Sequence, residues 1–220
     1  MIDFFDIPAK RFNYHFRKVE GESKYRKLTI NKATGKPRTI HAVSKRLRNI
    51  QRKALKKLQE KFQPRSHAHG FAPGKSIVTN ATCHLKSKRI IKMDLKDFFP
   101  SIHFGRVRGM FMAKPFEFGE NAATIMAQLA CLEEDQGGIL PQGGSLSPYV
   151  ANMICRRLDQ RLAQVARSHR CHFTRYADDI TFSTNDVSQE NIDDLIKETS
   201  SVIESEDFIV NKDKTKMKNQ

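Results

Sequence analysis

Apolar residues recur at helical spacing in some stretches of the 220-residue chain and alternate with polar residues in others. Helices are predicted over residues 44–62, 104–113, 121–132, 148–165 and 188–205, with a short helix after a loop at 70–77. Strands are predicted at 25–30, 38–42 and 89–94 and on both sides of a tight turn within 173–183, and residues 210–216 as a strand or turn that leads into a basic tail. Ser147 can cap the helix over 148–165. Because the elements alternate without βαβ regularity, the pattern favours an α+β fold with helices packed on one side of an antiparallel sheet.

Two adjacent carboxylates, Asp178 and Asp179, fall at the predicted turn, and a third acid, Asp94, ends the strand over 89–94. If these strands pair side by side, the three carboxylates converge on one spot. Oxygen ligands of this kind suit Mg²⁺, and two such ions about 3.5–4 Å apart can catalyse phosphoryl transfer. The alternative is a solvated turn, since Asp is common in turns.

Positive charge is concentrated in the first part of the chain, whose overall formal net charge is +15. Residues 1–92 carry 24 Lys and Arg against 5 Asp and Glu, whereas residues 93–220 carry 15 against 19. The first part therefore suits a polyanion such as nucleic acid, with a merely solubilising surface as the alternative. On the predicted helix over 44–62, the face opposite the apolar residues is almost all Lys and Arg, a stripe able to follow phosphates.

No secretory signal and no apolar run near 18 residues is visible, so we expect a cytoplasmic protein without membrane contact. The cysteines form no CxxC pair, which argues against a zinc ribbon and favours reduced thiols. We interpret His67, His69 and His84 as polar turn residues rather than metal ligands. The four cysteines are Cys83, Cys131, Cys155 and Cys171.

Four segments resemble, in order, the motifs of the reverse transcriptases. Residues 176–179 (Tyr-Ala-Asp-Asp) are similar to the Tyr-x-Asp-Asp signature, and residues 94–102 to the motif that carries the first metal-binding aspartate. Residues 140–148 resemble the Pro-Gln-Gly loop and Ser-Pro helix start, and residues 211–215 the motif whose lysine lies near the active site. The resemblance implies a right-hand polymerase of fingers and palm, with an antiparallel palm sheet packed on helices.

Within this family, the likeness is greatest to bacterial retron enzymes, with group II intron enzymes next. Residues 69–71, 76–77 and 173–183 are similar to both groups, whereas residues 80–84 (Asn-Ala-Thr-Cys-His) resemble an Asn-Ala-x-x-His element associated with retrons.

The resemblance also implies a domain division. Residues 1–70 and 103–142 would form the fingers, and residues 71–102 and 143–220 the palm. Family members continue past the lysine motif into a further strand and a thumb that grips the duplex, and we expect both to be absent here.

For catalysis, the resemblance implies that Asp94, Asp178, Asp179 and the carbonyl of Leu95 hold two Mg²⁺ ions, with Mn²⁺ as an alternative metal. Lys214 would lie behind the carboxylates and reduce their repulsion, unless it is an ordinary tail lysine.

Further residues would handle the nucleotide and the primer. Arg38 and Lys32 would contact the incoming triphosphate, or else be surface charges. Phe99 would be a steric gate against a ribose 2′-hydroxyl, or else a core aromatic. The others are Gln142 at the incoming sugar and base pair, Gly143 permitting close backbone approach, and Tyr176 near the primer terminus.

The leading hypothesis is an RNA-directed DNA polymerase of retron type, a class linked to antiviral defence, that extends a primer on a structured RNA template. Its partners would be a structured non-coding RNA, the RNA–DNA duplex, deoxynucleoside triphosphates, and a thumb-supplying or effector protein. One alternative is a group II intron-like or defence-associated enzyme that synthesises DNA with or without a template. Another is a non-catalytic RNA-binding module of fingers and palm.

Overall fold

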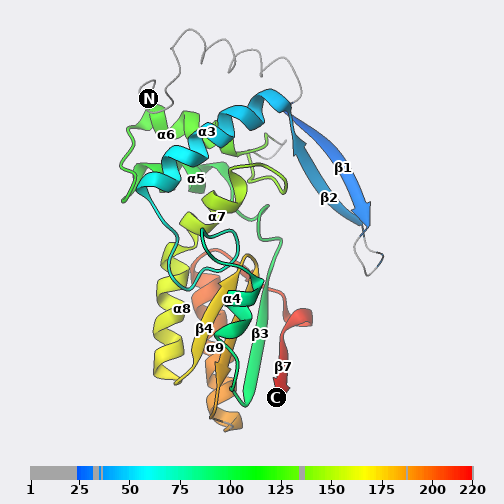
Figure 1. Ribbon diagram of the computed structural model, residues 1–220, viewed down its shortest axis with the longest axis vertical. Helices are drawn as coiled ribbons and strands as arrows, with labels where there is room; N and C mark the ends of the chain where they lie inside the picture. The colour runs from blue at the N-terminus through cyan, green and yellow to red at the C-terminus, as the bar shows by residue number, and fades with distance from the viewer. Residues whose placement is uncertain (1–23, 32–34, 36, 134–136, 187, 220) are drawn as a thin grey trace. The chain divides into compact units, whose positions relative to one another are not determined.

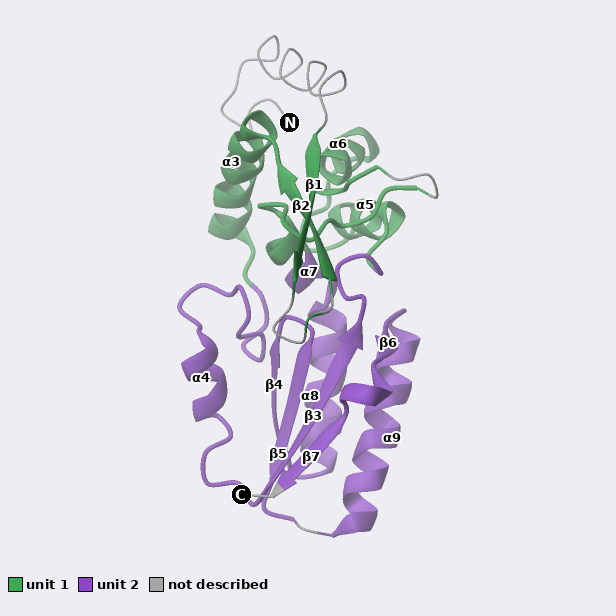
Figure 2. Cartoon of the chain, turned by 90° about the vertical axis from the view of Figure 1, so that its right-hand side faces the viewer, with its two compact units in different colours: residues 1–63, 102–150 green, residues 64–101, 151–220 purple. Residues whose placement is uncertain are grey.

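The computed structural model describes residues 24–31, 35, 37–133, 137–186 and 188–219. The chain divides into two compact units, which Figure 2 shows in different colours: residues 1–63 with 102–150 (unit 1) and residues 64–101 with 151–220 (unit 2). The assignment of these units to fingers and palm stays a prediction. Residues 143–150, which we expected with the palm, belong to unit 1.

Unit 1 begins with the predicted hairpin. Strand β1 (Tyr25–Asn31) pairs antiparallel with β2 (Pro37–Val43), from Tyr25 opposite Val43 to Asn31 opposite Pro37. Most side chains of β1 are exposed, while Tyr25 is buried at its base. The hairpin is therefore anchored at the end that joins the helical part of unit 1.

Three helices form the core of unit 1. Helix α3 (Lys45–Lys61) starts at Ser44, whose hydroxyl accepts a hydrogen bond from the Leu47 amide at 3.4 Å, a standard N-cap. It packs on α6 (Glu120–Ala130), which also packs on α5 (Phe104–Met112). The predicted apolar stripe of α3 is buried, whereas its Lys and Arg side chains are largely exposed. The buried stripe includes Leu47, Ile50, Ala54 and Leu58.

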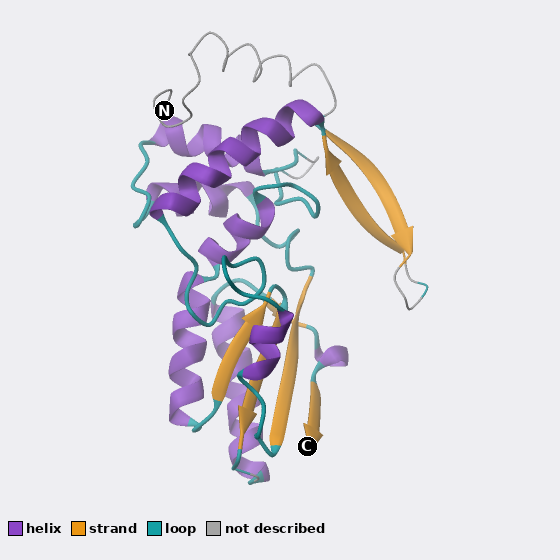
Figure 3. Ribbon diagram, viewed as in Figure 1, coloured by secondary structure: helices purple, strands orange, loops and turns teal. Residues whose placement is uncertain are grey.

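A five-stranded sheet is the centre of unit 2. Its order is β4 (His172–Tyr176), β5 (Asp179–Thr184), β3 (Arg89–Lys96) and β6 (Ile209–Val210), and β7 (Lys216–Asn219) also pairs with β3. Every one of these pairings is antiparallel. The mixture of this sheet with helices, coloured in Figure 3, confirms the predicted α+β class.

Helices cover the sheet of unit 2. Helix α8 (Arg156–Ser168) packs on β4 and on α9 (Gln189–Ser205), which also contacts β6 (Figure 1). The short helix α4 (Ile77–Thr82) contacts β4 and carries a capping box between Ser76 and Thr79. No helix in the described part of the chain is long and apolar enough to cross a lipid bilayer.

The single helix predicted over 148–165 is wrong. The chain forms α7 (Ser147–Ile154) and then α8, separated by Cys155 with φ −73° and ψ 0°. That ψ departs from the helical value of about −42°. The apolar pattern runs through both helices because it indicates which residues are buried, and it carries no information on whether the helix is continuous. Ser147, predicted as the cap, is instead the first helical residue, and its buried hydroxyl has no hydrogen-bond partner in the described structure.

The basic tail predicted at the end of the chain, and the expected absence of a strand after the lysine motif, are also wrong. After a short 3-10 turn (Lys212–Lys214), strand β7 pairs with residues 89–92 of β3. Backbone hydrogen bonds hold such a strand whatever the polarity of its side chains, so Lys216 and Lys218 are accommodated while remaining exposed.

Candidate active site

The three predicted acids converge at one end of the paired strands of unit 2. Asp94 lies directly opposite Asp179 in the β3–β5 ladder, and the Leu95 amide donates to the carbonyl of Asp178 at 3.0 Å. Side chains directly opposite in an antiparallel pair have Cβ atoms about 4.5–5.5 Å apart. The predicted pairing of the two segments is therefore confirmed.

The turn that carries Asp178 has an unusual backbone. Ala177 adopts φ +57°, the left-handed region, between the end of β4 and the start of β5. Such a conformation costs about 1–3 kcal/mol at a non-glycine residue and persists where neighbours enforce it. The contacts that enforce it therefore also fix the position of Asp178.

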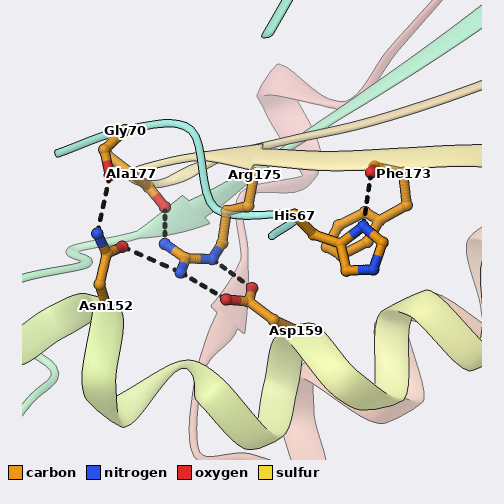
Figure 4. A network of polar contacts seen from close by, with 7 residues as sticks. All are labelled: His67, Gly70, Asn152, Asp159, Phe173, Arg175 and Ala177. Atoms are coloured by element: carbon orange, nitrogen blue, oxygen red, sulfur yellow. Dashed lines mark hydrogen bonds and ion pairs between the residues drawn. The ribbon is translucent and has the colours of Figure 1, made fainter. Parts of the chain in front are cut away.

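Arg175 supplies one of those contacts from the core of unit 2 (Figure 4). Its guanidinium donates to the carbonyl of Ala177 at 2.9 Å and forms a two-point ion pair with Asp159 of α8 at 2.6 and 2.8 Å. Both charged side chains have no exposed surface. Burial alone would lower the pKa of Arg175, but the Asp159 carboxylate, together with Cys155 and Asp178, raises it overall. The arginine therefore stays charged beneath the turn.

Residues 67–70 supply a second set of supporting contacts; His67 and Gly70 are labelled in Figure 4. The Arg175 amide donates to the His67 carbonyl, and the Arg175 carbonyl accepts from the His69 amide, both at 2.8 Å. The Gly70 carbonyl accepts from Asn152 at 2.8 Å, and Asn152 in turn accepts from Arg175 at 3.1 Å. A Cβ at Gly70 would lie 2.5 Å from the Ala177 nitrogen, so only glycine permits this approach.

The acids carry more negative charge than their neighbours offset. Burial raises the pKa of Asp179, and the charges of Asp178 and Asp94 raise it further, while Lys92 and Lys214 lower it. Lys214 donates to both carboxylate oxygens of Asp94, at 2.8 and 2.9 Å, and that hydrogen bond raises the pKa of the lysine. One ammonium bound to a cluster of three carboxylates leaves an excess of negative charge.

The donor chemistry of this cluster fits a hard divalent cation, since carboxylate and carbonyl oxygens are its preferred ligands. Within the described residues, no three His, Cys, Asp or Glu side chains are gathered closely enough to hold a metal ion as they stand. The Asp94 carboxylate instead accepts hydrogen bonds from Lys214, at 2.8 and 2.9 Å, and from Asn211, at 2.9 Å.

Two predicted nucleotide or primer residues lie in the same unit. Phe99 follows β3 and is partly exposed, with its ring centroid 5.2 Å from that of the buried Phe98. Tyr176 ends β4 next to the turn and is also partly exposed. Both rings contact Phe71, at centroid distances of 6.4 Å.

The other predicted nucleotide residues belong to unit 1, where two of them contact each other. Arg38 of β2 donates its Nε–H to the side-chain oxygen of Gln142 at 2.9 Å, and the His41 amide donates to the Gln142 carbonyl at 2.8 Å. Gly143 has φ +120°, and a Cβ there would lie 2.7 Å from the His41 carbonyl oxygen. Lys32 lies outside the described residues.

His84 differs from the polar turn residue that we predicted. It is buried, and its two ring nitrogens are 2.7 Å from the Ser183 hydroxyl and 2.6 Å from the Thr174 hydroxyl. Burial, with a further contribution from the charge of His172, lowers the pKa of His84 to about 4. The imidazole is therefore neutral at physiological pH and joins the segment before β3 to strands β4 and β5.

Sequence reasoning missed the supporting residues Arg175, Asp159 and Asn211. The available signals were a lone arginine in a strand rich in aromatic and β-branched residues and an aspartate on the apolar face of a helix, because buried charges need partners. The position of Asn211 beside Asp94 had no comparable signal.

The comparisons with known proteins agree with this geometry. The family model described as "Reverse transcriptase (RNA-dependent DNA polymerase)" matches residues 30–220. The chain is 38% identical over 208 residues to "Retron Mx65 reverse transcriptase" of Myxococcus xanthus, covering 88% of this chain and 48% of that protein. It is 32% identical over 197 residues to "Retron Ec86 reverse transcriptase" of Escherichia coli, covering 87% and 58%. The chain therefore spans about half the length of these curated relatives.

Among solved structures, telomerase from Candida albicans in complex with a TWJ fragment of telomeric RNA matches with a TM-score of 0.57 and 13% identity. The match covers 97% of this chain and 48% of the telomerase chain, and at that identity it shows the fold alone. Together with the family match over residues 30–220, the ordered motifs and the antiparallel sheet that unites Asp94 with Asp178 and Asp179 establish that the chain belongs to the reverse transcriptase family and is similar to its retron members.

Proposed function

We propose that this chain extends a primer on an RNA template by adding deoxynucleotides. The observation that carries the proposal is the placement of Asp94 opposite Asp179, with Asp178 one residue away, at the end of a β-ladder next to a turn whose Ala177 carbonyl Arg175 binds. Phosphoryl transfer needs positioned charge more than covalent chemistry, and a fixed cluster of acids meets that need. The exposed cationic face of α3 supports binding of an RNA backbone.

In this proposal Asp94, Asp178 and the Leu95 carbonyl hold two divalent cations, with Asp179 adding negative charge beside them. When bound, Mg²⁺ supplies the positive charge that activates a primer 3′-hydroxyl and offsets charge on the leaving pyrophosphate. Lys214 reduces the repulsion among the acids, and it must loosen its hold on Asp94 for both of that residue's oxygens to serve as ligands.

The remaining roles concern the nucleotide and the primer. Arg38, with Lys32 as a second contact, binds the triphosphate, because a guanidinium offers paired donors to phosphate oxygens. Gln142 contacts the incoming sugar and base pair, and Gly143 permits the backbone approach. Phe99 excludes a 2′-hydroxyl and Tyr176 packs at the primer terminus.

The proposed template is a structured RNA, which is what the resemblance to retron reverse transcriptases implies. The test is primer extension on an RNA template with Mg²⁺ and four deoxynucleoside triphosphates, comparing the wild-type chain with Asp178→Asn. Asp193→Asn, an exposed acid on α9 outside the cluster, is the matched control.

We expect Asp178→Asn to abolish incorporation while RNA binding, measured by gel shift, stays near the wild-type level, and Asp193→Asn to resemble the wild type in both. Equal loss of incorporation and RNA binding in Asp178→Asn would make the acid structural. Product that is not complementary to the template would support the template-independent alternative.

A further inference from the structure

Phe71 is a large apolar side chain in an unfavourable setting. Its side chain is 47% exposed, and its backbone has φ +58°, a region that bulky residues rarely adopt. It follows Gly70, which hydrogen bonds and close packing hold against the Tyr176–Ala177 backbone. The loop therefore presents this ring at a fixed place beside the catalytic turn, and an exposed aromatic held in a strained conformation points to a function.

The contacts of Phe71 indicate what that function is. Its ring lies 6.4 Å, centroid to centroid, from both Phe99 and Tyr176, within the range of favourable aromatic pairs. Phe99 contacts Phe98, which is 4% exposed and packs on Phe208 at 5.8 Å. The partly exposed ring of Phe99 is thus held by a buried aromatic and by Phe71.

We propose that Phe71 is a positioning residue that holds Phe99 in place and so sets the discrimination between deoxyribonucleotides and ribonucleotides. This rests on the proposed polymerase function and on Phe99 as the steric gate. A gate works by repulsion, and it excludes a 2′-hydroxyl only if its ring cannot turn aside. Phe98 restrains Phe99 from the core, and Phe71 restrains it at the exposed side of the site.

The test measures kcat/KM for one deoxynucleoside triphosphate and its matching ribonucleoside triphosphate, with the 220-residue chain on a primed RNA template. The variants are Phe71→Asn, Phe71→Tyr, Phe99→Ala and the double variant Phe71→Asn/Phe99→Ala. Asn tolerates the left-handed backbone, so Phe71→Asn removes the ring without adding strain. Ile77→Ala, which truncates a 68%-exposed side chain nearby, is the matched control.

We expect Phe71→Asn to raise the ribo- to deoxyribonucleotide ratio about threefold to tenfold, as the loss of one restraining aromatic pair permits. Phe71→Tyr, which keeps the ring, should have the wild-type ratio, and Ile77→Ala should leave the ratio unchanged. In the double variant the ratio equals that of Phe99→Ala, because Phe71 acts through Phe99.

Three results would overturn the proposal at different levels. If Phe99→Ala raises the ratio and Phe71→Asn does not, Phe71 has no positioning role. If the two effects multiply in the double variant, Phe71 acts independently of Phe99. If the wild-type chain incorporates no nucleotide at all, the proposed polymerase function fails and takes this inference with it.

Discussion

Lys214 places its ammonium nitrogen 2.8 Å from Oδ1 and 2.9 Å from Oδ2 of Asp94, a residue 120 positions earlier in the chain. The lysine therefore occupies the same oxygens that the proposed divalent cations would need. Because its side chain is 56% exposed, water screens the pair, and little free energy opposes its exchange for a doubly charged ion.

Replacing Lys214 changes the pH dependence of incorporation. Lys214→Gln removes a charge that lowers the pKa of Asp179, so that pKa rises further and the carboxylate becomes protonated at higher pH. The acid limb of the pH–rate profile of single-nucleotide incorporation should therefore move to higher pH. Lys197→Gln, an exposed lysine of α9, should leave the profile in place. An unmoved acid limb in Lys214→Gln contradicts this prediction.

Neutralising Asp179 is expected to stabilise the metal-free fold. The pKa of Asp179 is raised above its usual value of 3.8, so its contribution to stability is present at low pH and is lost as pH rises through the raised pKa. Asp179→Asn in EDTA at neutral pH should melt at most a few degrees above the wild type, since residue 179 is exposed and water screens its charge. The difference in melting temperature between the variant and the wild type should disappear at acidic pH. Mg²⁺ should raise the melting temperature of the wild type more than that of the variant. A variant that melts lower at every pH would contradict the assignment.

Arg175 and Asp159, the buried ion pair beneath the turn at Ala177, should be energetically coupled. Removing one partner, as in Arg175→Met or Asp159→Leu, leaves an unpaired buried charge and costs about 3–5 kcal/mol of unfolding free energy. The double variant should lose clearly less unfolding free energy than the two single variants lose in sum. Chemical denaturation measures these losses. It should still incorporate nucleotides poorly, because the Ala177 carbonyl loses its donor. Additive losses of stability would show that the two side chains are not coupled.

Gly143 and Gly137 offer a matched pair in unit 1. Both have positive φ, +120° and +105°, but a Cβ at Gly143 would lie 2.7 Å from the His41 carbonyl oxygen, whereas nothing lies within 4 Å of one at Gly137. Both alanine variants incur backbone strain, and only Gly143→Ala adds a clash, so it should be the less stable by about 1–3 kcal/mol. Equal melting temperatures would mean that the hairpin moves aside without cost.

His84 gives the fold a specific acid sensitivity. The pKa of His84 is lowered from 6.5 to about 4, so its contribution to stability is present above pH 6.5 and is lost as pH falls toward 4. A shift of that size corresponds to at most about 3 kcal/mol. His84→Asn should therefore flatten the pH dependence of unfolding free energy between these values. The wild type and the variant are compared by the slope of unfolding free energy against pH. Absolute free energies are not compared, because His84→Asn also loses two hydrogen bonds.

Local pattern was sufficient for most elements of the fold and for the strand pairing that brings the acids together. Apolar periodicity located α3 and α9, and the short strands around Asp178 were correctly paired with the strand of Asp94. The break at Cys155 could not be predicted, because the same apolar face continues on both sides of it.

The supporting contacts were also beyond sequence reasoning, for a different reason. Arg175 and Asp159 come from a strand and a helix whose packing no local pattern specifies, and Asn211 reaches Asp94 from 117 positions away. Such partners depend on tertiary distance. The motifs therefore locate the chemistry, and the structure supplies what holds it.

The hydrogen bonds between residues 67–70 and β4 have a consequence for association between molecules. β4 is the outermost strand of its sheet, and unpaired backbone groups on such a border invite a strand from another chain. At Arg175 both backbone groups are already bonded to His67 and His69. A foreign strand cannot extend the sheet there without displacing them, so the border nearest the turn at Ala177 is protected against intermolecular sheet growth.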